Sequence, residues 1–167
     1  MFHDVDDAKM AVITAAKQYY AAINSKPEFI PGKTYIPVTA KVVDENDLSY
    51  LIDASLDMWL TAGRYAREFE SVFGQHFGRT TKSLLVNSGS SANLVAISSL
   101  GSPDVAKMGY KALEAGDEII TVAAGFPTTV NPIIQNGWVP VFIDIDKITL
   151  NALPEKIMEA RTSKTRA

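Results

Sequence analysis

The chain has 167 residues with a formal net charge of -3 and no cysteine, and 47% of its residues are hydrophobic. This composition is typical of one globular domain, or of one domain with an extra arm. The charge provides no basic surface for nucleic acid or for an anionic membrane. The lack of cysteine excludes disulfides, thiolate metal sites and cysteine nucleophiles from these residues.

The first residues contain no cationic segment followed by an apolar run, so no secretory signal is visible. The longest apolar runs are far too short to cross a bilayer. We therefore expect a cytoplasmic protein with neither a membrane partner nor a nucleic-acid partner.

Up to about residue 78 the sequence predicts helices joined by an irregular connector. Apolar residues at helical spacing predict helices over residues 7–23, 44–60 and 64–77. Two prolines and a glycine predict a loop over residues 25–33, and Gly78 is expected to end the third helix. That helix is expected to turn four side chains inward: Phe69, Val72, Phe73 and His76.

Beyond residue 82, short apolar strands alternate with helices. Strands are predicted at 83–86, 118–122 and 140–145, helices at 91–100, 127–136 and 154–160, and a helix or ordered loop at 103–114. This alternation is typical of βαβ units, in which helices cover both faces of a parallel sheet. Ligands bind such sheets at the carboxyl ends of the strands.

Residues 162–167 resemble the start of another strand. Three parallel strands are few for a doubly wound sheet and would leave an apolar edge without a partner. We therefore expect these residues to be the front part of a larger, truncated protein.

An Asn-Ser-Gly-Ser-Ser run joins the first predicted strand to the helix behind it. A helix N-terminus carries unpaired backbone N–H groups and the positive end of a dipole. Gly89 permits close approach of a ligand, and Ser88, Ser90 and Ser91 add hydroxyl donors. The run therefore fits a phosphate or another small anion, although serine and asparagine also cap helices without any ligand. The residues alone leave both interpretations open.

Five motifs follow one another along the chain: Trp59-Leu60-Thr61-Ala62-Gly63-Arg64, Phe69-Glu70 with Gly78 behind it, Ser88-Gly89-Ser90, Gly116-Asp117-Glu118-Ile119-Ile120-Thr121 and Pro140-Val141-Phe142-Ile143-Asp144-Ile145-Asp146. Together they resemble the sugar aminotransferase and dehydratase family of fold-type I pyridoxal phosphate (PLP) enzymes over residues 43–167. The resemblance implies an α/β fold. An N-terminal helix and extended arm over residues 1–40 would precede an incomplete PLP-transferase large domain, a three-layer αβα structure, over residues 41–167.

Three segments are similar to one branch of that family, the CDP-4-dehydro-6-deoxyglucose 3-dehydratases, which make 3,6-dideoxyhexose precursors for lipopolysaccharide. They are residues 29–38, 90–93 and 123–132, and the second of them, Ser90-Ser91-Ala92-Asn93, replaces the Thr-Ala-Ala-Leu common among the aminotransferases. The branch implies PLP or pyridoxamine phosphate, a nucleotide-sugar substrate, a partner reductase and a homodimer. It also implies a 2Fe-2S cluster C-terminal to these residues, and a histidine in place of the Schiff-base lysine.

The resemblance carries a cofactor site onto this chain, but no catalytic residue. Gly89 and Ser90 match the positions that hold the cofactor phosphate, and Ser88 and Ser91 stand beside them as further donors. Phe126 matches the aromatic residue that stacks on the pyridine ring, whereas a phenylalanine at a strand end is otherwise usually part of a core.

In this family the proton-transferring group and the acidic partner of the pyridine nitrogen lie beyond Ala167. Among the residues present, Asp144 and Asp146 are the alternative for the ring nitrogen, but they match a structural turn after the strand. His3 and His76 are expected to pack or to lie at the surface, and no metal site is expected. Eight lysines are expected to be solvated: Lys33, Lys41, Lys82, Lys107, Lys111, Lys147, Lys156 and Lys164.

Three functions therefore stay open. The first is the N-terminal part of a PLP-dependent sugar-nucleotide 3-dehydratase, inactive by itself. The second is a sugar-nucleotide aminotransferase of the same family, and the third is a truncated, non-catalytic product that binds intact subunits. A Rossmann dinucleotide binder would need a Gly-x-Gly-x-x-Gly run after a strand, which this chain lacks.

Overall fold

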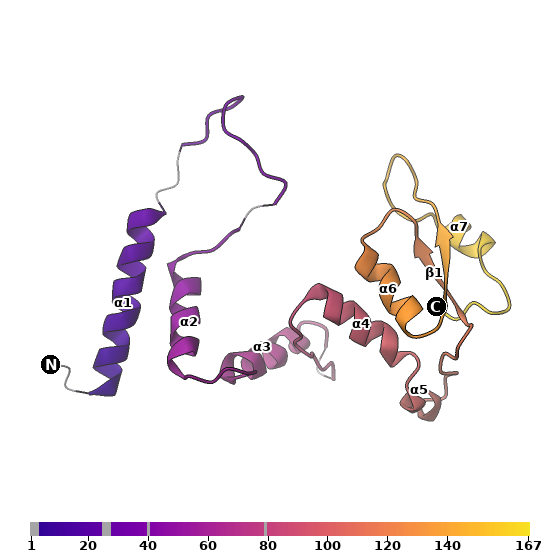
Figure 1. The fold of residues 1–167 in the computed structure, drawn as a ribbon, viewed down its shortest axis with the longest axis horizontal. Coiled ribbons are helices and arrows are strands. Elements are labelled where there is room, and N and C mark those ends of the chain that lie inside the picture. Colours follow the sequence, from indigo (N-terminus) through magenta and orange to yellow (C-terminus); the bar gives the residue numbers. More distant parts are fainter. Residues whose placement is uncertain (1–3, 25–27, 40, 79) are drawn as a thin grey trace. The chain divides into compact units, whose positions relative to one another are not determined.

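The computed structural model describes residues 4–24, 28–39, 41–78 and 80–167 (Figure 1). The chain divides into two compact units, Met1–Leu85 and Val86–Ala167. Within the described ranges, no helix is both long and apolar enough to cross a membrane.

The first unit is helical. It contains α1 (Val5–Ile23), α2 (Glu45–Leu56) and α3 (Arg64–Gln75), and α1 packs against α2. Aspartates begin the first two helices, because the Asp4 carboxylate accepts hydrogen bonds from the first backbone N–H groups of α1 and Asp44 does the same for α2.

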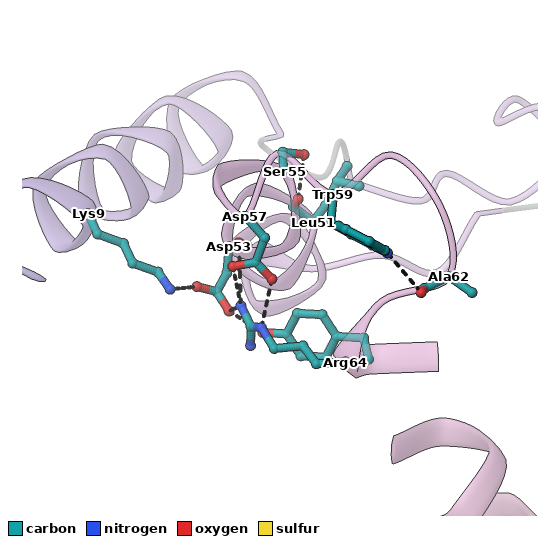
Figure 2. A network of polar contacts seen from close by, with 9 residues as sticks. Lys9, Leu51, Asp53, Ser55, Asp57, Trp59, Ala62 and Arg64 are labelled. Carbon is teal, nitrogen blue, oxygen red and sulfur yellow. Dashed lines mark hydrogen bonds and ion pairs between the residues drawn. The ribbon is translucent and has the colours of Figure 1, made fainter. Parts of the chain in front are cut away.

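A carboxylate on α2 links the three helices of this unit. Figure 2 shows Asp53 accepting contacts from Lys9 of α1 and Arg64 of α3, and the hydroxyl of Tyr65 also donates to it. Arg64 Nε donates to Asp57 at 2.8 Å, and its guanidinium lies 4.3 Å from the centre of the Tyr65 ring. The hydrogen bond from Lys9 is the main cause that holds the pKa of Asp53 well below its usual range. The hydrogen bonds to Asp53 in turn raise the pKa of Lys9 and the pKa of Tyr65.

The second predicted helix is shorter than expected. The prediction of a helix to residue 60 is wrong, because α2 ends at Leu56 and Met58 adopts a left-handed backbone with φ 51°. The chain then turns, and the Trp59 indole N–H donates to the Ala62 carbonyl at 3.1 Å. This turn brings Arg64 to the start of α3, within reach of Asp53.

The predicted inward face of α3 is also wrong. Phe69, Val72 and Phe73 are 50%, 52% and 44% exposed, and His76 is exposed too. The buried residue of α3 is Gly74, where an added Cβ would come within 3.0 Å of the Thr81 carbonyl oxygen. Helical spacing identifies an apolar face, but that face is buried only where another element covers it.

The second unit is mixed helix and sheet, as the alternation predicts. It contains α4 (Gly89–Ser99), α5 (Pro103–Lys107), β1 (Glu118–Val122), α6 (Pro127–Gln135), β2 (Val139–Ile143) and α7 (Pro154–Glu159). The strands β1 and β2 are parallel, with Glu118 opposite Val139, and α6 connects them. Residues 103–114, predicted as a helix or ordered loop, form a short helix followed by loop.

The last residues of the chain, predicted to resemble the start of another strand, pair with β1 through an isolated parallel bridge. Thr165 lies parallel and opposite to Glu118. The Glu118 N–H donates to the Lys164 carbonyl at 3.0 Å, and the Glu118 carbonyl accepts from the Arg166 N–H at 2.9 Å. Successive residues of a strand turn their N–H and C=O groups to opposite edges, and Asp117 bonds Val139 of β2, so this segment lies on the other edge of β1.

The predicted strand at 83–86 does not form. In the part of the chain that the structure describes, residues 83–86 have no strand partner. An apolar run becomes a strand only when a second strand satisfies its backbone groups, and these residues have β-type composition without that partner.

A small apolar cluster forms the core of the second unit. Ile119 of β1, Ile133 of α6 and Trp138 are 5%, 1% and 6% exposed. Ile97 and Leu100 from the α4 region, together with Leu113, pack against this cluster. The cluster joins α4, α6 and the sheet, and so determines where the ends of these helices lie.

The Asp53 network predicts how the stability of the first unit depends on pH. A carboxylate whose pKa is lowered on folding stabilises the fold above its unfolded pKa of about 3.9, and this contribution is lost as the pH falls below that value. We therefore expect Asp53→Asn to lower the hydrogen-exchange protection of α1 and α2 amides between about pH 5 and pH 7, and the difference from the unsubstituted chain to shrink toward about pH 2.

Asp104→Asn is the matched control, because Asp104 pairs with Lys107 and both side chains are more than 70% exposed. An exposed pair of this kind contributes little. An Asp53→Asn effect that stays the same from pH 5 to pH 2 would contradict the role assigned to the ionised carboxylate.

Candidate functional site

The predicted anion-binding run lies at the N-terminus of α4. Ser88 is the N-cap residue, and its hydroxyl oxygen accepts a hydrogen bond from the Ser91 N–H at 3.2 Å. The Ser88 hydroxyl in turn donates to Ser91 Oγ at 3.2 Å. The capping interpretation therefore describes Ser88, and one of the free N–H groups of the first turn is already satisfied by the chain itself.

Two backbone donors remain at this end of α4. Among the described residues, the N–H groups of Gly89 and Ser90 have no hydrogen-bond partner, whereas that of Ala92 donates to the Ser88 carbonyl. A Cβ added at Gly89 would meet nothing within 4 Å, so the space in front of this residue is open. The Ser90 side chain is exposed beside it. Two N–H groups and a hydroxyl at the positive end of a helix dipole are a donor set that suits a phosphate.

The helices α4 and α6 pack side by side and run in the same direction. Near their N-termini, Asn93 Nδ2 of α4 donates to the Thr128 carbonyl of α6 at 3.3 Å. Near their C-termini, Asn136 Nδ2 donates to Ser98 Oγ at 3.0 Å. Because early residues meet early residues and late residues meet late ones, the two helices are parallel and both N-termini lie at the same end.

Phe126 lies at that shared end. It is the N-cap residue of α6, two residues before Thr128, and its side chain is 73% exposed. It is therefore not a core phenylalanine of this unit. The structure thus brings the four residues 88–91 together on one helix end and places Phe126 at the end of the helix packed beside it.

A groove of about 160 Å³ runs between the two helices behind this end. Ser90, Ser91 and Leu94 line it from α4, and Thr128, Asn131 and Gln135 line it from α6. The sequence marked Thr128 and Asn131 only as part of the segment 123–132 and gave no α6 residue a place in a groove, because only the packing of the helices brings these residues opposite α4.

The aspartates after β2 take part in turns. Asp146 Oδ1 accepts from the backbone N–H groups of Ile148 and Thr149, at 3.1 and 2.7 Å, and Asp144 Oδ1 accepts from the Ile145 N–H at 2.8 Å. The bonds from Thr149 above all hold the pKa of Asp146 below its usual range. This geometry agrees with the structural turn that the sequence indicates.

The other candidate groups lie at the surface or outside the described residues. His76 is exposed, and all eight lysines that the sequence analysis considered are exposed. His3 lies outside the described residues.

The chain belongs to the DegT/DnrJ/EryC1/StrS aminotransferase family, whose sequence profile matches residues 41–167. The predicted family is thereby confirmed, and the fold is that of the PLP fold-type I sugar aminotransferases and dehydratases.

Individual relatives agree with this assignment. The chain is 48% identical over 163 residues to dTDP-4-dehydro-2,6-dideoxy-D-glucose 3-dehydratase of Saccharopolyspora spinosa, covering 98% of this chain and 34% of the relative. It is 48% identical over 146 residues to the lipopolysaccharide biosynthesis protein RfbH of Salmonella typhimurium, covering 87% and 32%. Among solved structures, Escherichia coli GDP-4-keto-6-deoxy-D-mannose-3-dehydratase with bound hydrated PLP is 37% identical with a TM-score of 0.65, covering 78% of this chain and 32% of that one. The chain thus spans about a third of the length of these relatives.

The cap at Ser88 can be separated experimentally from the remaining donors. We expect Ser88→Ala to lower the stability of α4 by about 1 kcal/mol, since it removes the acceptor of the Ser91 N–H. Ser90→Ala, two residues further along the chain, removes an exposed hydroxyl and should change the stability of α4 by less than about 0.5 kcal/mol. Urea unfolding followed through the NMR signals of α4 amides measures both. Equal losses in the two variants would contradict the division between a serine that caps α4 and an exposed serine that does not.

Proposed function

We propose that this chain binds the phosphate of PLP or pyridoxamine phosphate with Gly89, Ser90 and Ser91, with Ser88 holding the turn, and the pyridine ring against Phe126. The observation that supports this is the parallel packing of α4 and α6, which brings an anion-binding helix end and an exposed aromatic ring to the same side. A flat apolar side chain suits a flat conjugated ring, and the donor set of α4 suits a phosphate.

The reaction that we propose for the whole protein is removal of the C-3 hydroxyl from a nucleotide-linked 4-keto-6-deoxyhexose. When bound, PLP or pyridoxamine phosphate supplies an electron sink for such chemistry. In this chain the proposed contribution is binding and orientation: α4 fixes the phosphate, and Phe126 sets the plane of the ring. Relatives named as 3-dehydratases of dTDP- and GDP-linked sugars support the reaction class.

The finer assignment that we propose is a CDP-linked substrate on the way to 3,6-dideoxyhexoses of lipopolysaccharide O-antigen. The name of RfbH, a lipopolysaccharide biosynthesis protein, supports the lipopolysaccharide part of this assignment. With it we propose a homodimer, a reductase partner and a 2Fe-2S cluster. The cluster would take no ligand thiolate from these residues, since they include no cysteine. The division at residue 40 between an arm and the large domain, and the cytoplasmic location, also remain proposals.

The second candidate is a PLP-dependent sugar-nucleotide aminotransferase, favoured by the family profile itself. Both candidates need the same phosphate and ring contacts, so binding experiments test what they share.

Pyridoxamine phosphate is the better probe of this site, since it has no aldehyde to react with the exposed lysines. We expect it to bind more tightly than pyridoxamine, which lacks the phosphate. Ser90→Ala should raise the Kd for pyridoxamine phosphate about tenfold, as expected for the loss of one hydrogen bond to a charged group. Isothermal calorimetry measures these constants.

Ser99→Ala is the control, because it makes the same substitution at the opposite end of α4, where the hydroxyl donates to the Ala96 carbonyl. Phe126→Ala, which removes the proposed ring contact, should also raise the Kd for pyridoxamine phosphate. Phe142→Ala is its control, since Phe142 is also more than half exposed but lies on β2. Equal affinity for the two probes in the unsubstituted chain would overturn the proposed phosphate site.

We further expect the 167 residues by themselves to show no dehydration of a CDP-4-keto-6-deoxyhexose. The proposed roles of Ser88–Ser91 and Phe126 are to hold and orient, and none of them transfers a proton. Loss of water from the sugar is followed by mass spectrometry in the presence of PLP or pyridoxamine phosphate, and the dTDP-4-dehydro-2,6-dideoxy-D-glucose 3-dehydratase of Saccharopolyspora spinosa, acting on its own dTDP-linked sugar, is the positive control. Turnover by this chain alone would contradict the expectation, and parallel reactions with dTDP- and GDP-linked sugars test the choice of nucleotide.

A further inference from the structure

A carbonyl in the first turn of α6 lacks its normal partner. In an α-helix the carbonyl of Thr128 would accept the N–H of residue 132, but residue 132 is a proline and has none. Thr128 is only partly exposed. A carbonyl in this position costs stability unless another donor reaches it.

Asn93 of α4 supplies that donor. Its Nδ2 lies 3.3 Å from the Thr128 oxygen, so the gap that Pro132 leaves in α6 is filled across the helix–helix contact. The bond joins the first turn of α6 to α4 about one turn behind the residues that face the proposed phosphate.

The hydrogen bond between Asn93 and Thr128 lies close to Phe126 along the chain. The Thr129 N–H donates to the Phe126 carbonyl at 3.0 Å, so Phe126 is bonded into the same first turn as Thr128. The far end of α6 is held separately, because Asn136 donates to Ser98 Oγ at 3.0 Å and to the Pro132 carbonyl at 2.7 Å. Asn93 therefore bonds the first turn of α6, and Asn136 bonds its C-terminal end.

We infer that Asn93 is a positioning residue, whose amide holds the first turn of α6, and with it Phe126, at a set place beside the anion-binding end of α4. The inference rests on the proposed function. It does not require Asn93 to touch the cofactor.

Asn93→Leu tests the inference, since leucine has similar volume and cannot donate. We expect the Kd for pyridoxamine phosphate to rise about three- to tenfold, the range expected for one lost hydrogen bond. The Kd for inorganic phosphate, which needs α4 alone, should change less than about twofold. The shift of the Phe126 ring signals in NMR on addition of pyridoxamine phosphate should also shrink. A merely structural role would weaken both ligands alike.

A double-mutant cycle with Phe126→Ala decides whether the effect passes through the ring. We expect Asn93→Leu to have no further effect on affinity once Phe126 is absent. Asn136→Ala, which removes the hydrogen bond to Ser98 at the other end of α6, is the matched control. It should leave the ratio of the affinities for pyridoxamine phosphate and inorganic phosphate unchanged.

The outcomes distinguish a failure of the inference about Asn93 from a failure of the proposed cofactor binding. If the unsubstituted chain binds neither inorganic phosphate nor pyridoxamine phosphate, the proposed function fails first. If the unsubstituted chain binds both ligands, three results overturn the inference alone. The first is that Asn93→Leu leaves both affinities unchanged, and the second is that it lowers both by the same factor. The third is that it lowers the affinity for pyridoxamine phosphate as much in the Phe126→Ala background as in the unsubstituted chain.

Discussion

The seating of α6 on the sheet is the contact on which the second unit depends. Ile133, 1% exposed, is its most buried side chain, and it packs with Ile119 of β1 and with Trp138 just before β2. Each such side chain contributes roughly 1.5–3 kcal/mol when fully buried, so three of them matter greatly to a unit of this size. The packing tolerates little change, since a Cβ added at Gly101 would lie 2.9 Å from the Trp138 ring.

The packing of α6 on the sheet and of α4 along α6 places the positive ends of two helix dipoles at the same side. With α6 placed by the cluster and α4 packed along it, two helix N-termini meet at one end, each equivalent to about half a positive charge. An anion there interacts with both dipoles. The cap at Ser88 does not compete with this role, because it satisfies the Ser91 N–H and leaves those of Gly89 and Ser90 without a partner among the described residues. A cap and a donor set that suits an anion, which the sequence presents as alternatives, are therefore compatible within four consecutive residues.

Sequence reasoning succeeded where the determinants are local. Helix α6 begins at Pro127 and ends before Asn136-Gly137, and β1 has the predicted bounds, because turn residues and apolar runs act within a few residues. It failed where a distant partner decides. Residues 83–86 carry strand composition but find no strand partner in the described part of the chain, and Phe69 and Phe73 of α3 share an apolar face that the described residues leave exposed. In the proposed site, the place of Ser88 to Ser91 at the start of a helix could be predicted from one short run, whereas the hydrogen bond from Asn93 to Thr128 depends on how the two helices pack.

Asn93 and Pro132 are best understood as one unit, although 39 positions separate them. The proline removes an N–H from the interior of α6, which in an isolated helix would be a plain defect. The asparagine amide restores the lost bond from the neighbouring helix, and so turns the defect into a contact point between the two helices. A leucine at position 93 would leave the Thr128 carbonyl without this donor as long as residue 132 is proline. The polar residue at position 93 is therefore tied to the proline at position 132, and together they set how the aromatic end of α6 faces the anion-binding end of α4.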